Sequence, residues 1–403
     1  MTALAAVELS DVAAFIRGIT FKPEDVVPVD TPGAAACMRT KNVQTELDLC
    51  DVWGIPQSFV RREDQYLIPG DVLVSSANSW NLVGKCCLVP SLPWRSTFGG
   101  FISVLRANPA KVDPRYLFRW FASDRTQATV RSFGQQTTNI SNLNVGRCLK
   151  LKLHLPALPE QRRIAEILDK ADALRAKRRA ALAQLDALTQ SIFLDMFGDP
   201  ATNPKGWPCA QLCTLGTKFS DGPFGSNLKS DHYRASGVRV VRLQNIGVGE
   251  FLGADAAYIS EDHFRNLKKH ECLPGDVLVG TLGDPNLRAC IQPRWLSVAL
   301  NKADCVQIRP DERTATSEFV CFLLNQPGTQ RMAQDLMHGQ TRIRISMGRL
   351  RSLAIPVPPI GLQRDFTQQV AAMETLKTAH RAALAQLDAL FASLQHRAFL
   401  GDL

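Results

Sequence analysis

Two stretches of the chain repeat apolar residues at alternating steps of four and three, which is the spacing of a coiled-coil helix. They span Glu160–Phe197 and Leu362–Phe399, contain no Gly or Pro, and are rich in Ala, Leu, Gln, Arg and Asp. At 1.5 Å per residue, each stretch forms a rod of roughly 57 Å. A helix of this length needs a partner along its length, so we expect the two rods to pack antiparallel about an approximate twofold axis.

The two predicted seams share one interruption. Polar residues occupy the fourth and fifth seam positions, Arg175 and Arg178 in the first rod and Lys377 and His380 in the second. Two interpretations are open: a solvated stretch where the rods diverge, or a docking point for another subunit. The seam positions are Ile164, Leu168, Ala171, Arg175, Arg178, Leu182, Leu185, Thr189, Ile192 and Met196, and then Phe366, Val370, Met373, Lys377, His380, Leu384, Leu387, Phe391, Leu394 and Ala398.

The residues before each rod predict an α/β (α+β) domain. Short apolar and β-branched runs are broken by Gly, Pro, Asn and Asp, and they alternate with short helical patches such as Pro114–Ala122 and Ser317–Leu324. A proline cluster, around Pro156 and again around Pro358, separates each domain from its rod. We therefore expect a first domain over residues 1–156, a helical spacer over 157–200, a second domain over 201–357 and a second spacer over 358–403.

Three matches in the same order indicate a tandem duplication. The string PGDVLV occurs at Pro69–Val74 and again 205 positions later. A Gly-Gln-rich segment followed by Ile-Ser begins at Gly134 and again at Gly339, also 205 apart. The string AALAQLDAL at Ala180–Leu188 recurs without change 202 positions later. The predicted architecture is thus two similar domains joined by two long helices with pseudo-twofold symmetry.

The charge distribution points to a polyanionic partner for the domains. The chain has 47 Lys and Arg against 38 Asp and Glu, a net charge of +9. Residues 1–156 carry 17 basic and 13 acidic side chains, and residues 201–357 carry 19 and 14. The two helical spacers are neutral, with 7 of each sign and 4 of each sign. Neutralisation of phosphates therefore belongs to the domains, and the rods have the composition of struts or protein-binding elements.

Other features favour a protein of the reducing cytoplasm. The first ten residues have no basic residue ahead of their apolar run, which argues against a secretory signal, and no stretch has the length of apolar residues that a membrane span needs. The 11 cysteines are odd in number and scattered, so we expect free thiols and no disulfides. Cys209 and Cys213 lack a second ligand pair at zinc spacing, and we expect no metal site.

The sequence offers no catalytic centre that we can identify. An adenine methyltransferase needs a glycine-rich cofactor turn and an Asn/Asp-Pro-Pro-aromatic loop; the nearest strings, Gly247-Val248-Gly249 and Asp284-Pro285-Asn286-Leu287, do not match. Pro69-Gly70-Asp71 lacks the further carboxylate and lysine of a nuclease, and no phosphate-binding Gly-Lys-Ser/Thr loop is found. We expect a protein without catalytic residues and without its own cofactor.

The best candidates for DNA contact are the paired Gly-Gln loops, because they combine base-reading side chains with glycine freedom. The predicted contacts are Gln135, Gln136, Thr137, Thr138 and Asn139 in the first domain, and Gln340, Thr341, Arg342 and Arg344 in the second. The alternative is an ordinary polar turn before a strand. Secondary candidates are Asn78, Trp80, Asn81 and Lys85, with Ser226, Asn227, Lys229, Asn286 and Arg288 in the second half.

The motifs at the rod boundaries resemble a known family. The proline boundary followed by EQRRIAEILD at Glu160–Asp169, and later FGDP at Phe197–Pro200, is similar to the central conserved region of Type I restriction-modification specificity subunits. The segments Leu9–Pro23 and Asp221–Lys229 resemble the starts of their target recognition domains. The likeness covers essentially the whole chain. It departs at the second boundary, where Gly361-Leu362-Gln363 stands in place of Pro-Glu-Gln.

This resemblance implies a function. Each domain would read one half of a bipartite DNA target, while two modification subunits grip the rods and methylate adenines. Restriction subunits would add ATP-driven translocation and cleavage, so S-adenosylmethionine, ATP and Mg²⁺ are expected on partner subunits. Two rival hypotheses stay open at this point: a self-contained restriction or modification enzyme, and a DNA-binding scaffold or regulator without methyltransferase partners.

Overall fold

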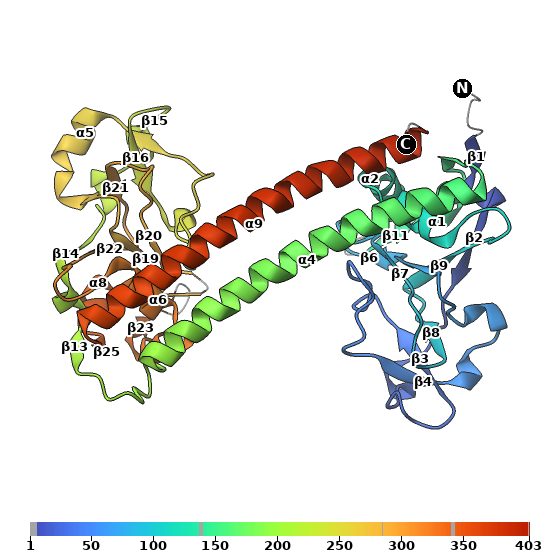
Figure 1. Cartoon of the computed structure of the whole chain (residues 1–403), viewed down its shortest axis with the longest axis horizontal. Helices are drawn as coiled ribbons and strands as arrows, with labels where there is room; N and C mark the ends of the chain where they lie inside the picture. Colours follow the sequence, from blue (N-terminus) through green and yellow to red (C-terminus); the bar gives the residue numbers. More distant parts are fainter. Residues whose placement is uncertain (1–5, 137–139, 284, 340–342, 402) are drawn as a thin grey trace. The chain divides into compact units, whose positions relative to one another are not determined.

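The computed structural model describes residues 6–136, 140–283, 285–339, 343–401 and 403. It divides into two compact units, which we call unit 1 (Met1–Arg179 with Ala382–Leu403) and unit 2 (Ala180–Arg381). Each unit contains one α/β domain and a part of both long helices (Figure 1). The predicted fold class, two similar α/β domains with two long helices, is confirmed.

The long helices are α4 (Leu158–Phe197) and α9 (Ile360–Leu400). Each begins two residues before the predicted start, because Pro159 and Gly361 lie in the first turn, where proline loses no helical hydrogen bond. In unit 2, Phe193 near the end of α4 packs against Phe366 near the start of α9, with ring centroids 5.5 Å apart. In unit 1 the late α9 residue Ala398 shares a core with Ile164 early in α4. The helices are therefore antiparallel within each unit.

The seam residues are buried or half-buried towards the ends of both helices, and ion pairs join the helices at the interruption. Arg175 Nε donates to Asp388 Oδ1 at 2.6 Å in unit 1, and Lys377 Nζ contacts Asp186 Oδ1 at 2.8 Å in unit 2. Only 6% of the Lys377 side chain is exposed. The interpretation of a solvated stretch where the rods diverge does not hold for Arg175 and Lys377, since each forms an ion pair from one helix to the other. The alternative, a docking point for another subunit, stays a prediction.

A four-stranded antiparallel sheet is the centre of unit 1, in the order β2-β9-β5-β7. Val72 and Val74 of β5 face a core that includes Tyr116 and Leu168, whereas Leu73 faces the opposite side and packs with Phe98. The alternation of a strand thus separates a core against the helices from a core against a smaller sheet, β4-β3-β8. The elements are β1 (Ala6–Glu8), β2 (Ala13–Arg17), β3 (Ala34–Met38), β4 (Trp53–Pro56), β5 (Val72–Ser75), β6 (Ala77–Asn78), β7 (Cys86–Leu88), β8 (Ser96–Phe98), β9 (Ile102–Ala107), α1 (Pro114–Phe121), α2 (Asp124–Ser132), β10 (Gly134–Gln136), β11 (Ser141–Leu143), α3 (Val145–Leu149) and β12 (Lys152–His154).

Unit 2 follows the same plan with the sheet β14-β22-β19-β20. Val277 and Val279 of β19 face the core with Phe366, and Leu278 faces a second core with Val241 and Ala299. The second sheet, which takes the place of β4-β3-β8 in unit 1, has five strands here, in the order β15-β17-β16-β21-β18. The elements are β13 (Cys209–Gln211), β14 (Gly216–Asp221), β15 (Tyr233–Arg234), β16 (Val238–Val241), β17 (Tyr258–Ile259), α5 (Glu261–Asn266), β18 (Glu271–Cys272), β19 (Val277–Gly280), β20 (Arg288–Ile291), β21 (Ala299–Asn301), β22 (Cys305–Pro310), α6 (Ser317–Asn325), α7 (Pro327–Met332), β23 (Met337–His338), β24 (Arg344–Ile345), α8 (Met347–Arg351) and β25 (Ala354–Pro356).

The duplication extends to individual hydrogen bonds of buried polar side chains. Gln161 accepts from the Asp113 backbone N–H at 2.8 Å and donates to the carbonyls of Pro156 and Lys111. Gln363 makes the same three bonds in unit 2, with Thr316 N, Pro358 O and Thr314 O. Both glutamines are almost fully buried. Each therefore fixes the start of its long helix to the domain that precedes it.

The backbone pairing corrects the expected alignment of the two Gly-Gln loops. Leu143 N donates to Ser76 O, and Ile345 N donates to Thr281 O, so Leu143 and Ile345 are equivalent and lie 202 apart. Gly134 pairs with Leu143 at the start of its hairpin, whereas Gly339 follows the strand Met337–His338. The 205-residue offset that matched the two glycines therefore does not hold at this point of the fold.

Candidate nucleic-acid interface

The first predicted loop lies on a small three-stranded sheet, β10-β11-β6, in unit 1 (Figure 1). Gln135 is opposite Asn142, and Asn142 is opposite Ala77. Because residues directly opposite each other share a face, these three side chains lie on one side of the sheet. Ser141 and Leu143 point to the other side and are buried. The sheet thus presents a polar face to solvent and a buried face to the domain.

The polar face carries two neighbouring amide side chains. Gln135 and Asn142 are both exposed. Neither amide forms a hydrogen bond to another residue in the part of the chain that the structure describes. Asn142 was missed by the sequence analysis, because only the strand register shows that it shares a face with Gln135. Paired exposed amides present the donors and acceptors that suit the edge of a base.

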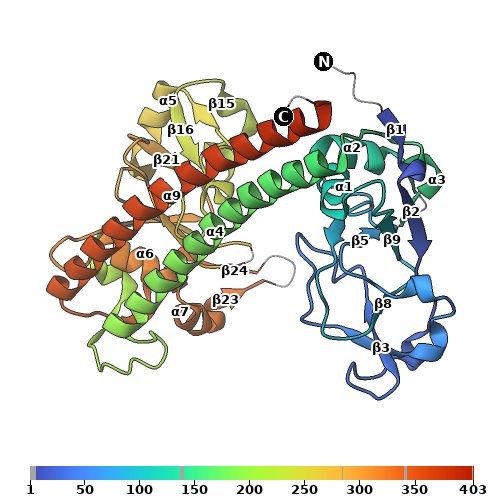
Figure 2. The same ribbon diagram turned by 45° about the vertical axis from the view of Figure 1, so that its right-hand side comes forward.

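The equivalent hairpin of unit 2 is formed by β23 and β24, with a bridge between Leu282 and Arg344 (Figure 2). Arg344 is the counterpart of Asn142, and half of its side chain is exposed. Its Nη1 atom lies 3.7 Å from Asp304 Oδ1. The predicted contacts Thr137, Thr138, Asn139, Gln340, Thr341 and Arg342 lie outside the described residues, and the Gln136 side chain is not described.

The secondary candidates of unit 1 surround the same sheet. Trp80 is 48% exposed and borders Gly134, since an added Cβ at that glycine would lie 3.3 Å from the indole ring. Lys85 donates to Gln44, and both line a pocket of about 250 Å³ with Asn78. The Asn78 amide is used internally, because its Nδ2 donates to Ser75 Oγ and its Oδ1 accepts from the Ser79 N–H. Asn81 Oδ1 accepts from the Ser79 hydroxyl.

The secondary candidates of unit 2 divide into two groups. The Arg288 guanidinium donates to four backbone carbonyls, and Asn286 bonds to Ile343 O and the Leu287 N–H. These two side chains hold loops in place. Ser226, Asn227 and Lys229 are exposed and follow Phe224, which lines a pocket of about 120 Å³ with Arg344 and Asp304.

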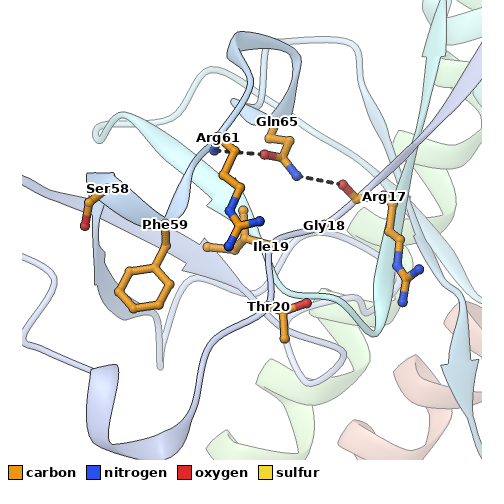
Figure 3. A pocket seen from close by; sticks show the side chains of 8 residues that line it. All are labelled: Arg17, Gly18, Ile19, Thr20, Ser58, Phe59, Arg61 and Gln65. Atoms are coloured by element: carbon orange, nitrogen blue, oxygen red, sulfur yellow. Dashed lines mark hydrogen bonds between the residues drawn. The ribbon is translucent and has the colours of Figure 1, made fainter.

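A further polar cavity of about 540 Å³ lies at the end of β2, between residues 17–20 and 58–65 (Figure 3). Gln65 joins its two sides, because its Oε1 accepts from Arg61 N and its Nε2 donates to Arg17 O, both at 3.2 Å. Strand β2 is one edge of the four-stranded sheet, and β7, which follows Lys85, is the other edge. This cavity is therefore separate from the β10-β11-β6 face.

The structure gives no indication of a reactive centre at the cysteines. All eleven are free thiols. Burial raises the pKa of Cys37 to about 12, and the same cause raises the pKa of Cys290 to about 12, so both thiols stay protonated and poorly nucleophilic. Over the described residues, no group of three or more His, Cys, Asp or Glu side chains is arranged to hold a metal ion. No described helix is both long and apolar enough to cross a membrane.

The chain thus contains two duplicated domains, each with a hairpin that exposes a polar side chain and each joined to a long helix. Residues 5–184 match the model of the Type I restriction modification DNA specificity domain. Over these residues, which make up just under half of the chain, the protein belongs to the family of Type I restriction-modification specificity subunits.

The chain is similar to two specificity subunits over nearly its whole length, and two solved structures share its fold. The chain is 23% identical to the StySPI specificity subunit of Salmonella potsdam, covering 99% of this chain and 89% of that one. It is also 23% identical to the EcoKI specificity subunit of Escherichia coli K12, covering 98% and 88%. The S subunit of M. genitalium has the same fold, with a TM-score of 0.58, 14% identity and coverage of 98% and 96%. A chain from a study of type I R-M complex assembly matches with a TM-score of 0.57 and 18% identity, covering 100% and 99%.

Proposed function

We propose that the protein is the non-catalytic, DNA-reading subunit of a Type I restriction-modification complex, and that each domain reads one half of a bipartite target. The observation that carries the proposal is the matched pair of hairpins, one in each duplicated domain, with Gln135 and Asn142 exposed in the first and Arg344 exposed in the second. The excess of basic residues in both domains supports the same role, because it favours binding to phosphates.

The partners follow from the same proposal. Two modification subunits with adenine-N6 methyltransferase activity bind the neutral helical segments, and restriction subunits join them. S-adenosylmethionine, ATP and Mg²⁺ are bound by those partner subunits. The charge neutrality of residues 157–200 and 358–403 supports an assignment of the helices to protein contacts rather than to DNA.

The test compares the purified full-length chain with the reconstituted complex. We expect the chain alone to bind no S-adenosylmethionine in equilibrium dialysis and to transfer no methyl groups to DNA. Addition of a cognate modification subunit should produce methylation at one bipartite sequence. Methyl transfer by the pure chain would contradict the proposal and favour a self-contained enzyme. Sequence-specific binding without any methyltransferase that co-purifies from the host would favour a regulator.

A further inference from the structure

The two hairpins place different chemistry at one equivalent position. Asn142 and Arg344 correspond, because each precedes the residue, Leu143 or Ile345, whose N–H bonds to the strand-end carbonyl of Ser76 or Thr281. Both residues lie on the solvent face of their hairpin. The duplication has therefore kept the backbone site and changed the side chain that it presents.

The residue that stands directly before the adjoining strand, β9 or β22, also differs between the two units. Asp304 stands directly before β22 and Phe101 directly before β9, so the two are equivalent. Phe101 O accepts from Ala77 N on the free side of β6, and the Phe101 side chain is 64% exposed. Unit 1 thus has an aromatic residue at the position where unit 2 has the carboxylate that pairs with Arg344.

Asp304 is held rigidly beside Arg344. Its φ of 65° is in the left-handed region, which Asp tolerates better than most residues. Its carbonyl accepts from both the N–H and the hydroxyl of Thr281, at 3.1 and 3.0 Å. The carboxylate then lies 3.7 Å from Arg344 Nη1. This ion pair orients the guanidinium, and half of the Arg344 side chain is exposed.

This arrangement suits a base edge better than a phosphate. A carboxylate next to the arginine repels a phosphate and offsets the attraction of the guanidinium for it. A guanine edge is neutral and presents O6 and N7 to a bidentate arginine, whose fork must be oriented rather than merely charged. In unit 1, the paired amides of Gln135 and Asn142 match the N6 and N7 groups of adenine.

We infer that the Asn142/Arg344 position is the specificity-determining position of both domains, with Arg344 reading a guanine in one half-target and Asn142, beside Gln135, reading an adenine in the other. The inference rests on the proposed function, and it adds the base that each domain distinguishes. Phe101 and Phe224, which are 64% and 51% exposed, supply apolar contact beside the two reading side chains.

The experiment selects from a pool of random-sequence DNA duplexes with the complex purified from the host through a tag on the full-length chain. The wild-type complex should enrich one bipartite sequence; if it enriches none, the proposed function fails and not only this inference. Arg344→Ala should lose preference for one guanine in one half-target by roughly 5- to 150-fold, with the other half unchanged. Arg344→Lys, which keeps the charge but not the fork, should lose the same preference.

A phosphate contact would give a different result. Arg344→Ala would then weaken binding to all DNA sequences equally and reduce the dependence of binding on salt. This outcome would overturn the inference about base reading, although it would still show that the hairpin contacts DNA. Arg313→Ala is the matched control, because Arg313 is also an exposed arginine paired with an aspartate in unit 2 but lies outside the hairpin. It should leave the selected sequence unchanged.

Unit 1 provides an independent test. Asn142→Ala should lose preference for one adenine in the half-target that Arg344→Ala leaves intact. The double substitution Phe101→Asp with Asn142→Arg transfers the unit 2 pair into unit 1, and it should shift the preference at that base from adenine to guanine. If Asn142→Ala and Arg344→Ala alter the same half-target, or if neither alters any base, the inference is wrong.

Discussion

Arg175 Nε donates to Asp388 Oδ1 at 2.6 Å, and this bond joins the first long helix to the second within unit 1. The relationship recurs in unit 2, where Lys377 contacts Asp186 at 2.8 Å. Both aspartates belong to the repeated string AALAQLDAL. The Arg175 guanidinium also lies over the Phe391 ring, 4.2 Å from its centroid. Each copy of AALAQLDAL therefore supplies the aspartate that pairs with a basic seam residue of the other helix.

The first prediction concerns the exchange of the two charges in the ion pair between Arg175 and Asp388. Arg175→Asp should destabilise unit 1, because it places two carboxylates next to each other. The reverse pair, Arg175→Asp with Asp388→Arg, should recover part of the loss. Asp388 is 42% exposed, so we expect a coupling of only about 0.5–1 kcal/mol in a double-mutant cycle of urea unfolding. Additive effects of the two single substitutions would show that the pair contributes nothing.

The second prediction concerns alkaline pH. Burial acts to lower the pKa of Lys377, but hydrogen bonds to Asp186 and Glu374 outweigh it, and the pKa is raised from 10.5. A raised folded-state pKa means that the pair stabilises the fold fully below about pH 10.5 and loses this effect as the pH rises through the folded value. The stability difference between wild type and Asp186→Asn should be constant from neutral pH to about 9 and shrink above 10.5.

Urea unfolding at several pH values, followed by circular dichroism, measures this difference. Lys377→Gln serves as the control, since a protein without the lysine should show no such pH dependence on Asp186→Asn. A difference between wild type and Asp186→Asn that stays the same at strongly alkaline pH would contradict the role of Lys377.

The third prediction concerns the buried glutamines. Gln161→Leu removes three hydrogen bonds and leaves the Asp113 N–H and two carbonyls without their partner. We expect a loss of about 1–3 kcal/mol in unit 1, together with faster hydrogen exchange of the Asp113 amide. Gln363→Leu should have the same effect in unit 2. Glu160→Ala, on the same turn and paired with exposed Arg163, should change stability by less than about 0.5 kcal/mol. Equal effects of Gln161→Leu and Glu160→Ala on stability would show that Gln161 does not fix the start of its helix to the domain.

The fourth prediction treats the helices as a ruler between the half-targets, because α4 and α9 each belong to both units. One heptad inserted directly before each copy of AALAQLDAL, at Ala180 and at Ala382, keeps the seam in register. It lengthens each helix by about 10 Å at 1.5 Å per residue. The unread spacer should grow by about three base pairs at 3.4 Å each, with both half-targets unchanged.

Sequencing of methylated genomic DNA from a host with the altered complex measures the spacer. A heptad inserted into α4 alone misaligns the Arg175 and Lys377 ion pairs, and we expect that variant to be inactive. An active double-insertion complex that keeps the original spacer would show that the helices do not set the distance.

The sequence alone determined the architecture of this protein. The heptad spacing predicted both long helices to within two residues at their starts, because a helix without Gly or Pro has one strong pattern and clear boundaries. The duplicated strings predicted two similar domains, and the charge counts assigned the basic excess to them. The direction of the helices followed as well, since two equivalent domains leave an antiparallel pair as the natural packing.

Only the tertiary structure decided what the polar positions do. Arg175 and Arg288 look alike in the sequence, yet one forms an ion pair with a residue more than 200 positions away and the other bonds to backbone carbonyls. Asn142 became a candidate because strand register places it opposite Gln135. Asn78 became a structural residue because its amide bonds to Ser75 and Ser79. The spacing of apolar residues follows from local backbone geometry, so it can be recognised in the sequence. The partner of a polar side chain depends on which distant segment the fold brings to it.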